Sequence, residues 1–392
     1  MEEVYLVSTA RTPIGRFGGL LSEFSAIDLG ALAIQGALKK ANIAPGLVQE
    51  VFLGNVISAN LGQAPARQTA LKAGIGNNIP CTLINKVCAS GMKSIMIGAQ
   101  SIMLGTNDVV VAGGMESMSN IPYYIPKARF GYKYGNAELI DGLQQDGLWE
   151  AYHQFAMGNC ADHTAREMNI TREEQDDYAI GSYKKVQEAT KKGFLKNEII
   201  PVEIPQKKGD PLIMDEDEEI HYVNFDKIPH LRPVFSPEGT VTAANASTIN
   251  DGASAVVLAS KEFVDEQNVK PVAKILGFAD AAQEPIWFTT SPSLAIPKAL
   301  QMAEISHNDV DYYEINEAFA VVVIANNRIL DLDPEKVNVF GGAVSIGHPI
   351  GCSGARITGT IINVLEEKGG RIGVAGICNG GGGASAIVLE KC

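Results

Sequence analysis

Ser90-Gly91-Met92-Lys93 near the start of the chain and Ser353-Gly354-Ala355-Arg356 near its end each open a predicted helix that leads into an apolar strand. The two strands, residues 109–113 and 372–376, both end in Val-Ala-Gly. The distance from Ser-Gly to Val-Ala-Gly is the same in both places, without a gap. These two stretches decide the fold, because they give the two ends of the chain the same order of elements.

A third strand pair obeys the same spacing, because residues 51–55 fall on residues 314–318. Self-similarity at a fixed offset indicates a duplicated unit, and chance is the alternative for so short a match. Strands and helices alternate within each copy, which predicts α/β layering with buried sheets. The predicted strands are 51–56, 82–87 and 108–112, and the predicted helices are 65–73 and 90–104.

Residues 119–248 break this alternation, so we predict that they form an inserted loop domain. The stretch carries many Tyr, Lys and Arg residues, a long helical pattern over 160–192 and an acidic run over 215–219. Insertions of this size in compact domains usually carry function. The predicted organisation is an N-terminal half (1–118 with 249–270), the inserted loop domain (119–248) and a C-terminal half (271–392).

The composition indicates an acidic, globular, intracellular protein. A length of 392 residues suits two or three domains. The formal net charge of −13 argues against non-specific binding of nucleic acid, which needs a basic surface. The six cysteines are dispersed, as expected for reduced thiols. The first residues show no leader pattern and no apolar run is long enough to span a membrane, so a cytoplasmic location without membrane contact is expected.

Cys88 lies where a predicted strand turns through Ala89-Ser90-Gly91 into a helix. The N-terminus of a helix presents free N–H groups and a positive dipole end, which stabilise a thiolate and an oxyanion. This position therefore suits a nucleophile. A buried small hydrophobic residue is the alternative, because most free cysteines are of that kind.

His348 precedes the equivalent helix of the second half, in Gly347-His348-Pro349. If the two halves pack about a pseudo-two-fold axis, the two helix N-termini meet at one pocket. A Cys and a His that meet in this way form a nucleophile and its base. A histidine in a loop is otherwise more often a surface or hydrogen-bonding residue.

Two further motifs end strands of the second half. Cys378 is followed by Asn379 and four consecutive glycines, 380–383, which leave the backbone bare enough for a ligand to approach its N–H groups. Asn316-Glu317 ends another apolar strand and suits a pocket lining. A structural turn and an ordinary helix cap are the respective alternatives.

Four blocks together resemble the signature motifs of the thiolase family, in order and at matching spacing across essentially the whole chain. They are Val87-Cys88-Ala89-Ser90-Gly91, Asn316-Glu317-Ala318-Phe319, Gly347-His348-Pro349 and Cys378-Asn379-Gly380-Gly381-Gly382. The resemblance implies a thiolase-like, five-layered αβαβα fold with two duplicated halves and an inserted loop domain. The Val-Cys-Ala-Ser-Gly form is more similar to the short-chain acetoacetyl-CoA thiolases than to the broad-range degradative enzymes.

The resemblance also implies a reaction: two acetyl-CoA condense reversibly to acetoacetyl-CoA and CoA by a ping-pong mechanism. Cys88 would take the first acetyl group, with His348 removing the thiol proton. Cys378 would take a proton from the methyl group of the second acetyl-CoA, and Asn316 would hold a water that stabilises the enolate together with His348. The backbone N–H groups of Cys88 and Gly380 would stabilise the tetrahedral intermediate.

The inserted domain is expected to bind coenzyme A as the carrier of the substrates. Lys207, Lys208, Lys227 and Arg232 supply cations for a pyrophosphate, although a solvated charged face is the alternative for each of them. Two residues depart from the family's common pattern, since Ala156 replaces a His and Tyr222 replaces an Arg found in some relatives. The family's CoA-contacting positions correspond to Met157, Tyr222, Val223, Asn224, Lys227, Phe235, Ala243, Ser247, Ala318 and Phe319.

The chain also resembles one subgroup of short-chain thiolases that binds a potassium ion. The corresponding ligands are the Tyr183 hydroxyl and the backbone carbonyls of Ala243, Ala244, Ala246 and Val344. No prosthetic group is expected, and no cluster has zinc-ligand spacing. A homotetramer built as a dimer of dimers is expected. The alternatives are a degradative 3-ketoacyl-CoA thiolase of broader chain length and a non-catalytic acyl-CoA or lipid carrier.

Overall fold

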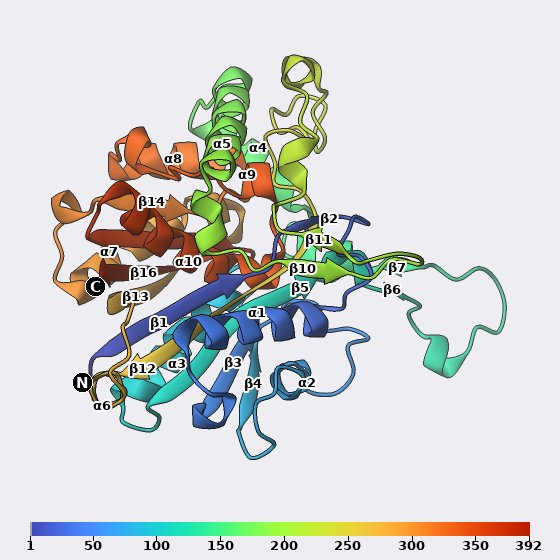
Figure 1. The fold of residues 1–392 in the computed structure, drawn as a ribbon. Helices are drawn as coiled ribbons and strands as arrows, with labels where there is room; N and C mark the ends of the chain where they lie inside the picture. The colour runs from blue at the N-terminus through green and yellow to red at the C-terminus, as the bar shows by residue number, and fades with distance from the viewer. Residues whose placement is uncertain (1) are drawn as a thin grey trace.

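The computed structural model describes residues 2–392, and its centre is one large mixed sheet (Figure 1). The strands run in the order β14-β15-β16-β13-β1-β12-β5-β3-β4, and the short β2 pairs with β12. The sheet has two parts that join where β1 pairs with β13 over only three residues, Val4 to Leu6.

The first half contains β1 (Val4–Arg11), β2 (Gly15–Arg16), β3 (Glu50–Gly54), β4 (Cys81–Ile84), β5 (Val109–Ser117) and β12 (Asn250–Ser260), with α1 (Ala26–Ala41), α2 (Pro65–Lys72), α3 (Ser90–Met103) and α6 (Lys261–Gln267). The second half contains β13 (Ala273–Ala282), β14 (Tyr312–Ile315), β15 (Ile372–Asn379) and β16 (Gly383–Lys391), with α7 (Pro292–Ala303), α8 (Ala320–Leu330), α9 (Ala343–Ile346) and α10 (Ile350–Lys368).

The internal repeat is visible in these bounds. Val109 and Ile372 are the first residues of β5 and β15, and the same number of residues separates Ser90 from Ser353. Each half also contains the equivalent pair of parallel strands, β3 with β5 in the first half and β14 with β15 in the second. Helix α10 begins at Ile350, one turn earlier than its counterpart α3.

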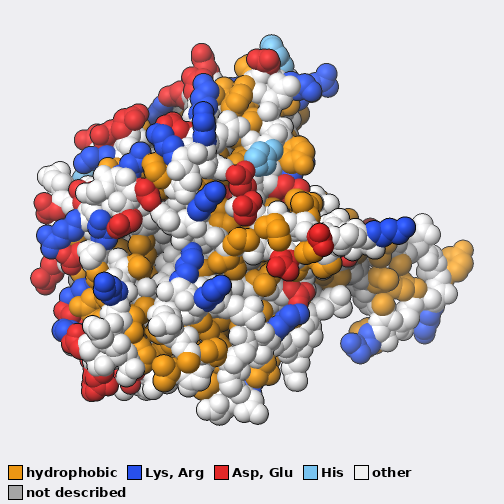
Figure 2. All heavy atoms as spheres, in the orientation of Figure 1, with side chains coloured by type: hydrophobic (Ala, Val, Ile, Leu, Met, Phe, Trp, Pro, Cys, Tyr) orange, Lys and Arg blue, Asp and Glu red, His pale blue; other side chains and the backbone are white. Residues whose placement is uncertain are grey.

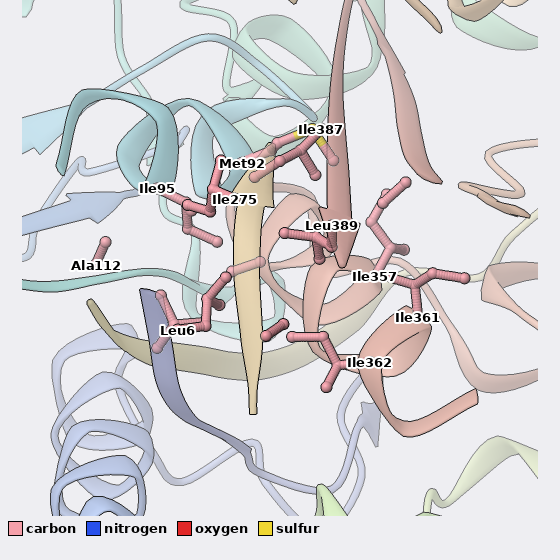
Figure 3. Packing of buried hydrophobic residues seen from close by; sticks show 14 of the residues in the cluster. Leu6, Met92, Ile95, Ala112, Ile275, Ile357, Ile361, Ile362, Ile387 and Leu389 are labelled. Carbon is pink, nitrogen blue, oxygen red and sulfur yellow. The ribbon is translucent and has the colours of Figure 1, made fainter. Parts of the chain in front are cut away.

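Alternation of side chains across the sheet builds the layers. Val110 and Ala112 of β5 belong to the central core, whereas Val109 and Val111 belong to the outer core against α1. Helices α3 and α10 pack between the two parts of the sheet, and α1 and α7 cover the outer faces. Figure 3 shows the central core, where Ile95 of α3 and Ile357 of α10 lie among residues of both halves. The predicted five-layered αβαβα arrangement is confirmed.

Helices α3 and α10 cross at two glycines that the repeat relates to each other, Gly91 and Gly354. A Cβ on Gly354 would lie 2.4 Å from the Met92 backbone nitrogen, and one on Gly91 would lie 2.8 Å from the Ala355 nitrogen. Only glycine allows the two backbones to approach so closely. The crossing therefore brings the N-termini of both central helices together.

Between β5 and β12, the structure places β6 (Tyr123–Tyr124), β7 (Ile140–Asp141), β8 (Trp149–Glu150), β9 (Phe155–Ala156), α4 (Met157–Glu167), α5 (Arg172–Lys192), β10 (Val202–Ile204) and β11 (Leu212–Met214). None of these strands joins the large sheet. The single helical stretch predicted over 160–192 is wrong, because it is two helices. Thr171 forms a capping box with Glu174 and starts α5 afresh.

A buried ion-pair network fastens this segment to the end of β1. Arg11 is 1% exposed, and its guanidinium pairs with Asp217 at 2.6 Å and with Glu198 at 2.9 Å. Asp217 also accepts a hydrogen bond from the Ile14 backbone N–H at 2.8 Å. The segment that lines the cavity described below is thus anchored to the N-terminal half.

Candidate active site

A cavity of about 600 Å³ opens where the central helices meet the segment between β5 and β12. Cys88, His348 and Gly380 lie in its wall, together with apolar side chains such as Leu148 and Ile350. A mostly apolar cavity of this size with a few converging polar groups is typical of a small-molecule site.

Cys88 sits in a tight turn just before α3. The Ser90 hydroxyl accepts a hydrogen bond from the Lys86 N–H at 2.8 Å and donates one to the Val87 carbonyl at 2.6 Å. Val87 itself has φ +48°, a strained conformation for a β-branched residue. The turn therefore holds the Cys88 sulfur at the mouth of a helix N-terminus in a conformation that its neighbours impose.

The Cys88 thiol is not ionised at neutral pH without help. Burial raises its pKa to about 11, although the backbone N–H groups of Gly380 and of Cys88 itself act in the opposite direction. Because both N–H groups act on the sulfur, they lie beside the point where charge would develop on a bound acyl group. The first half supplies one of these donors and the second half supplies the other.

His348 precedes α10 and faces the same cavity as Cys88. Burial, aided by the charge of Arg356, lowers its pKa to about 3, so the imidazole is neutral. The Ser353 hydroxyl donates to the Pro349 carbonyl at 3.0 Å and so accepts from His348 Nδ1–H at 2.6 Å. This arrangement leaves His348 Nε2 unprotonated and available as a base.

Asn316 stands next to this base nitrogen. Its amide Nδ2 is 3.4 Å from His348 Nε2, and its Oδ1 accepts a hydrogen bond from Arg356 at 3.4 Å. Arg356 also pairs with the buried Glu314 at 2.8 Å. The guanidinium fixes which end of the amide is the donor, so that Asn316 presents N–H toward His348.

Cys378 lies at the end of β15 and is fully buried. Burial raises the pKa of its thiol well above the ordinary value, and a charge on Cys88 raises it further. The structure thus brings the two sulfurs close enough to influence each other. Cys378 and Asn316 are both fully buried and do not lie among the cavity-lining residues, unlike Cys88 and His348.

The N-terminus of α10 is held by a buried carboxylate from the other half. Glu116 accepts hydrogen bonds from the Gly351 N–H at 2.9 Å, the Val56 N–H at 2.9 Å and the Asn55 amide at 2.8 Å. Burial raises the Glu116 pKa to about 7 against the effect of these donors. Glu116 therefore ties the helix that follows His348 to β3 and β5.

The predicted CoA-contacting residues divide into two groups. One group lines the cavity: Met157, Phe235, Ala243, Ser247, Ala318 and Phe319. Ser247 joins the loop to the second half, because its N–H and hydroxyl both donate to the Ala318 carbonyl, at 3.1 and 2.8 Å. The other group lies at or near the surface outside the cavity lining: Tyr222, Val223, Asn224 and Lys227. Arg16 connects the two groups, since it lines the cavity and its guanidinium lies 4.0 Å from the centre of the Tyr222 ring.

The predicted potassium ligands also lie near the cavity. Tyr183 is buried on α5 and packs with Val344 of α9, beside Val223 and Phe225. Ala243 and Ala246 line the cavity, and Ala244 follows between them in the same turn. Within residues 2–392, no three His, Cys, Asp or Glu side chains come together as metal ligands.

Sequence reasoning did not single out Ser353 or Arg356 as site residues. Both follow His348 within α10, and Arg356 comes three residues after Ser353, on the same face of the helix. This spacing from a candidate base was the only available signal. Arg16 and Glu116 lie far from the motifs in sequence and gave none.

Comparisons with known proteins agree with the fold. A family model described as "Thiolase, N-terminal domain" matches residues 4–262, and one described as "Thiolase, C-terminal domain" matches residues 269–391. The chain therefore belongs to the thiolase family, whose members are acyltransferases.

Its curated relatives carry a more particular name. An acetyl-CoA acetyltransferase of Schizosaccharomyces pombe is 58% identical over 390 residues, which cover 99% of each chain. A Gibberella zeae protein named acetyl-CoA acetyltransferase ERG10, cytosolic, is 56% identical, with 99% of this chain and 98% of that protein covered. Among solved structures, Acat5 thiolase from Ascaris suum in complex with coenzyme A is 44% identical, with a TM-score of 0.95 and full coverage of both chains.

Proposed function

We propose that this chain is an acetyl-CoA C-acetyltransferase, which joins two acetyl-CoA into acetoacetyl-CoA and free CoA through an acetyl thioester on Cys88. The observation that carries the proposal is the pairing of Cys88 and His348 in one cavity wall, each just before a helix N-terminus. The names of the relatives support the choice of acetyl-CoA as the substrate.

In the first half-reaction, His348 Nε2 takes the Cys88 thiol proton while the sulfur attacks the acetyl carbonyl carbon. The oxyanion of the tetrahedral intermediate is placed to accept hydrogen bonds from the Cys88 and Gly380 N–H groups. The C–S bond to CoA then breaks, and the CoA thiolate takes the proton back from His348. The neutral state of His348 in the free enzyme suits the first of these transfers.

In the second half-reaction, the Cys378 thiol first passes its proton to neutral His348, and the resulting thiolate acts as the base toward the methyl group of another acetyl-CoA. The enolate oxygen would be stabilised by His348 and by a water held on the Asn316 amide, which lies beside His348 Nε2. The enolate carbon attacks the acetyl-Cys88 carbonyl and forms the new C–C bond. The Cys88 sulfur leaves and takes the proton from His348, while Cys378 keeps the proton of the methyl group, so that all three residues return to their starting states. A thioester α-proton is weakly acidic, so enolate stabilisation carries much of the rate.

Two variants test this division of labour by intact-mass measurement and by product analysis. Cys88→Ser should form no acetyl adduct with acetyl-CoA, because a hydroxyl is far less ionised than a thiol. Cys378→Ala should be acetylated on Cys88 yet should not condense. An adduct that maps to Cys352, or condensation by Cys378→Ala within a few-fold of the native rate, would contradict the assignment.

Assays on the native protein distinguish the proposed function from its two alternatives. A non-catalytic carrier would gain no acetyl adduct at all. A broad-range 3-ketoacyl-CoA thiolase would keep its thiolysis rate on C8 and longer substrates, whereas we expect that rate to fall steeply beyond C4.

The cavity-lining residues would hold the pantetheine arm, and the exposed segment that carries Tyr222, Asn224 and Lys227 would contact the nucleotide end. The cavity is apolar at Met157 and Phe235, as suits the arm, and Arg16 lines it in an ion pair with Glu219 at 2.7 Å. Lys227→Ala should therefore raise the KM for acetyl-CoA and leave kcat unchanged. A fall in kcat with no change in KM would contradict this placement.

A potassium ion would be held by the Tyr183 hydroxyl and the four backbone carbonyls named above. Their fit is supported by one observation: in residues 2–392 the Tyr183 hydroxyl and the carbonyls of Ala243, Ala244 and Ala246 make no hydrogen bond. Oxygen ligands of this kind suit a hard cation. The ion would place a positive charge beside the loop that carries Ser247.

Replacing sodium by potassium at equal ionic strength should then raise both the melting temperature and the condensation rate. Tyr183→Phe should blunt both responses. Tetramethylammonium chloride is the control for general salt effects, because the ion is too bulky for a carbonyl cage. Superimposable melting curves and rates in the three salts would remove the site.

The assembly would be a homotetramer, a dimer of dimers, in the cytoplasm. Between β6 and β7 a loop projects from the body of the protein with Phe130 and Tyr134 almost fully exposed and with basic side chains around them (Figure 2). Such exposed apolar side chains suit contact with another copy.

The cytosolic name of one relative supports the location. No helix in residues 2–392 combines the length and apolar character needed to cross a bilayer. A native tetramer by light scattering, and a dimer for Phe130→Ser with Tyr134→Ser, would support this assembly, whereas a native monomer or dimer would contradict it.

A further inference from the structure

The two N–H groups beside the Cys88 sulfur come from different halves of the chain, so something must set their separation. The Cys88 donor sits in the strained turn at Val87, and the Gly380 donor sits in the glycine loop that joins β15 to β16. A Cβ on Gly380 would lie 3.4 Å from Val87 Cγ1, so the turn and the loop are already in close contact. A van der Waals contact alone does not fix a distance between two backbones.

Lys86 joins these two segments directly. It lies two residues before Cys88, and its ammonium group pairs with Asp280 of β13 and donates to the Ala384 carbonyl at 3.1 Å and to the Ser385 hydroxyl at 2.7 Å. An ammonium group has three protons, and these three acceptors use all of them. The Ser385 hydroxyl in turn donates to Asp280 at 2.6 Å, which closes the network.

Lys93 offers an internal comparison. Its ammonium group pairs with the other oxygen of Asp280 at 2.6 Å, and its side chain is as little exposed as that of Lys86, 25% against 24%. Lys93 lies at the end of the first turn of α3, however, and its ammonium group forms no hydrogen bond with Ala384 or Ser385. The two lysines therefore share a charge partner but differ in whether they tie the Cys88 turn to the strand after Gly380.

We propose that Lys86, through Asp280, Ala384 and Ser385, is a positioning residue that sets the separation between the Cys88 and Gly380 N–H groups. The inference rests on the proposed function, in which these groups stabilise the oxyanion. A donor displaced from the oxyanion loses its effect steeply, so a shift of about 1 Å costs up to roughly 100-fold in rate. Lys86 touches neither the substrate nor the sulfur and acts only through the backbone it holds.

The test compares Lys86→Met with Lys93→Met in the full-length protein. Both changes keep an unbranched side chain of similar length and remove one positive charge beside Asp280. Lys86→Met should lower the rate constants of Cys88 acetylation and of condensation by about 10- to 100-fold, with the KM for acetyl-CoA within three-fold of native. Lys93→Met should stay within two-fold in every constant.

Two further readouts distinguish positioning from a general loss of stability. Iodoacetamide should alkylate Cys88 more slowly in Lys86→Met at fixed pH, because a displaced Gly380 N–H no longer lowers the thiol pKa. The double variant Lys86→Met/Asp280→Asn should be no slower than Lys86→Met alone, since the two residues act as one unit. Ser385→Ala removes one acceptor without a change of charge and should lower the rate constant of Cys88 acetylation several-fold. This variant replaces Lys86→Met in the test if Lys86→Met does not fold.

Equal losses in the two lysine variants, or a Ser385→Ala protein with native acetylation and alkylation rates, would overturn the proposal. Failure of the proposed function looks different, because the native protein itself would then form no acetyl adduct on Cys88.

Discussion

Gly354→Ala should destabilise the protein although alanine is the better helix former. The new Cβ would lie 2.4 Å from the Met92 nitrogen and 2.9 Å from the Met92 Cβ, where real side chains keep at least 3.0 Å. The first of these neighbours is backbone, so a rotamer change cannot relieve the contact, and α3 and α10 must move apart.

The magnitude follows from two opposing effects. Overpacking of a dense core costs about 1–3 kcal/mol, and removing a glycine from a helix returns about 0.5–1 kcal/mol. We therefore expect the free energy of unfolding to fall by about 1–2 kcal/mol. The acetylation rate should fall as well, because the two helix N-termini carry Cys88 and His348.

Gly181→Ala is the matched control. Gly181 lies inside α5 and a Cβ there would meet no atom within 4 Å. This change should raise the free energy of unfolding by about 0.5–1 kcal/mol and leave the acetylation rate alone. Urea unfolding followed by circular dichroism measures the free energy of unfolding of both variants. If Gly354→Ala matched or exceeded the native stability, the close helix crossing would not be as described.

Three other outcomes are expected. Arg11→Met should lower the free energy of unfolding, measured by urea titration, by about 3–5 kcal/mol, because Glu198 and Asp217 remain as uncompensated buried charges. A loss under about 1 kcal/mol would show that the ion-pair network does not stabilise the fold. Alkylation of Cys88 by iodoacetamide should rise about tenfold per pH unit from pH 7 to 9, since the thiol pKa of about 11 lies above this range, and a flat profile would instead indicate a thiolate paired with imidazolium. Ser353→Ala should slow acetylation by about tenfold through loss of the hydrogen bond that orients His348, and Ser353→Thr should restore most of it; equal rates in the two variants would contradict this role.

The sequence predicted the architecture well because the duplication repeats it. The same spacing that relates Ser90 to Ser353 places β5 on β15 and α3 on α10, so one correct half supports the other. Local patterns were weaker at element ends. Strand β5 runs to Ser117, five residues beyond the predicted end, because Gly114 has no side chain and lets the strand pass close to the backbones of Gly351 and Gly91.

The sequence indicated the candidate catalytic motifs because each lies beside an element boundary, whereas it did not indicate the residues that hold their side chains in place. Arg356 acts on Asn316 through a hydrogen bond that exists only once α10 packs beside β14, and the Ser353 hydroxyl meets His348 only once the turn before α10 has folded. Lys86 and Asp280 are 194 residues apart, and nothing in either local sequence indicates a partner. Long-range polar contacts of this kind depend on the tertiary fold, which periodicity does not encode.

The position of β1 in the sheet has a consequence for how the chain emerges from the ribosome. This strand is made first, yet both of its partners, β12 and β13, begin only at residues 250 and 273. At about 5–20 residues per second, β1 waits roughly 12–50 s for a neighbour. During that time a nascent chain carries two apolar strands, β1 and β5, each with an unpaired edge. Because the first strand lies at the centre of the sheet, we expect chaperones to bind the nascent chain until about two-thirds of the protein has been synthesised.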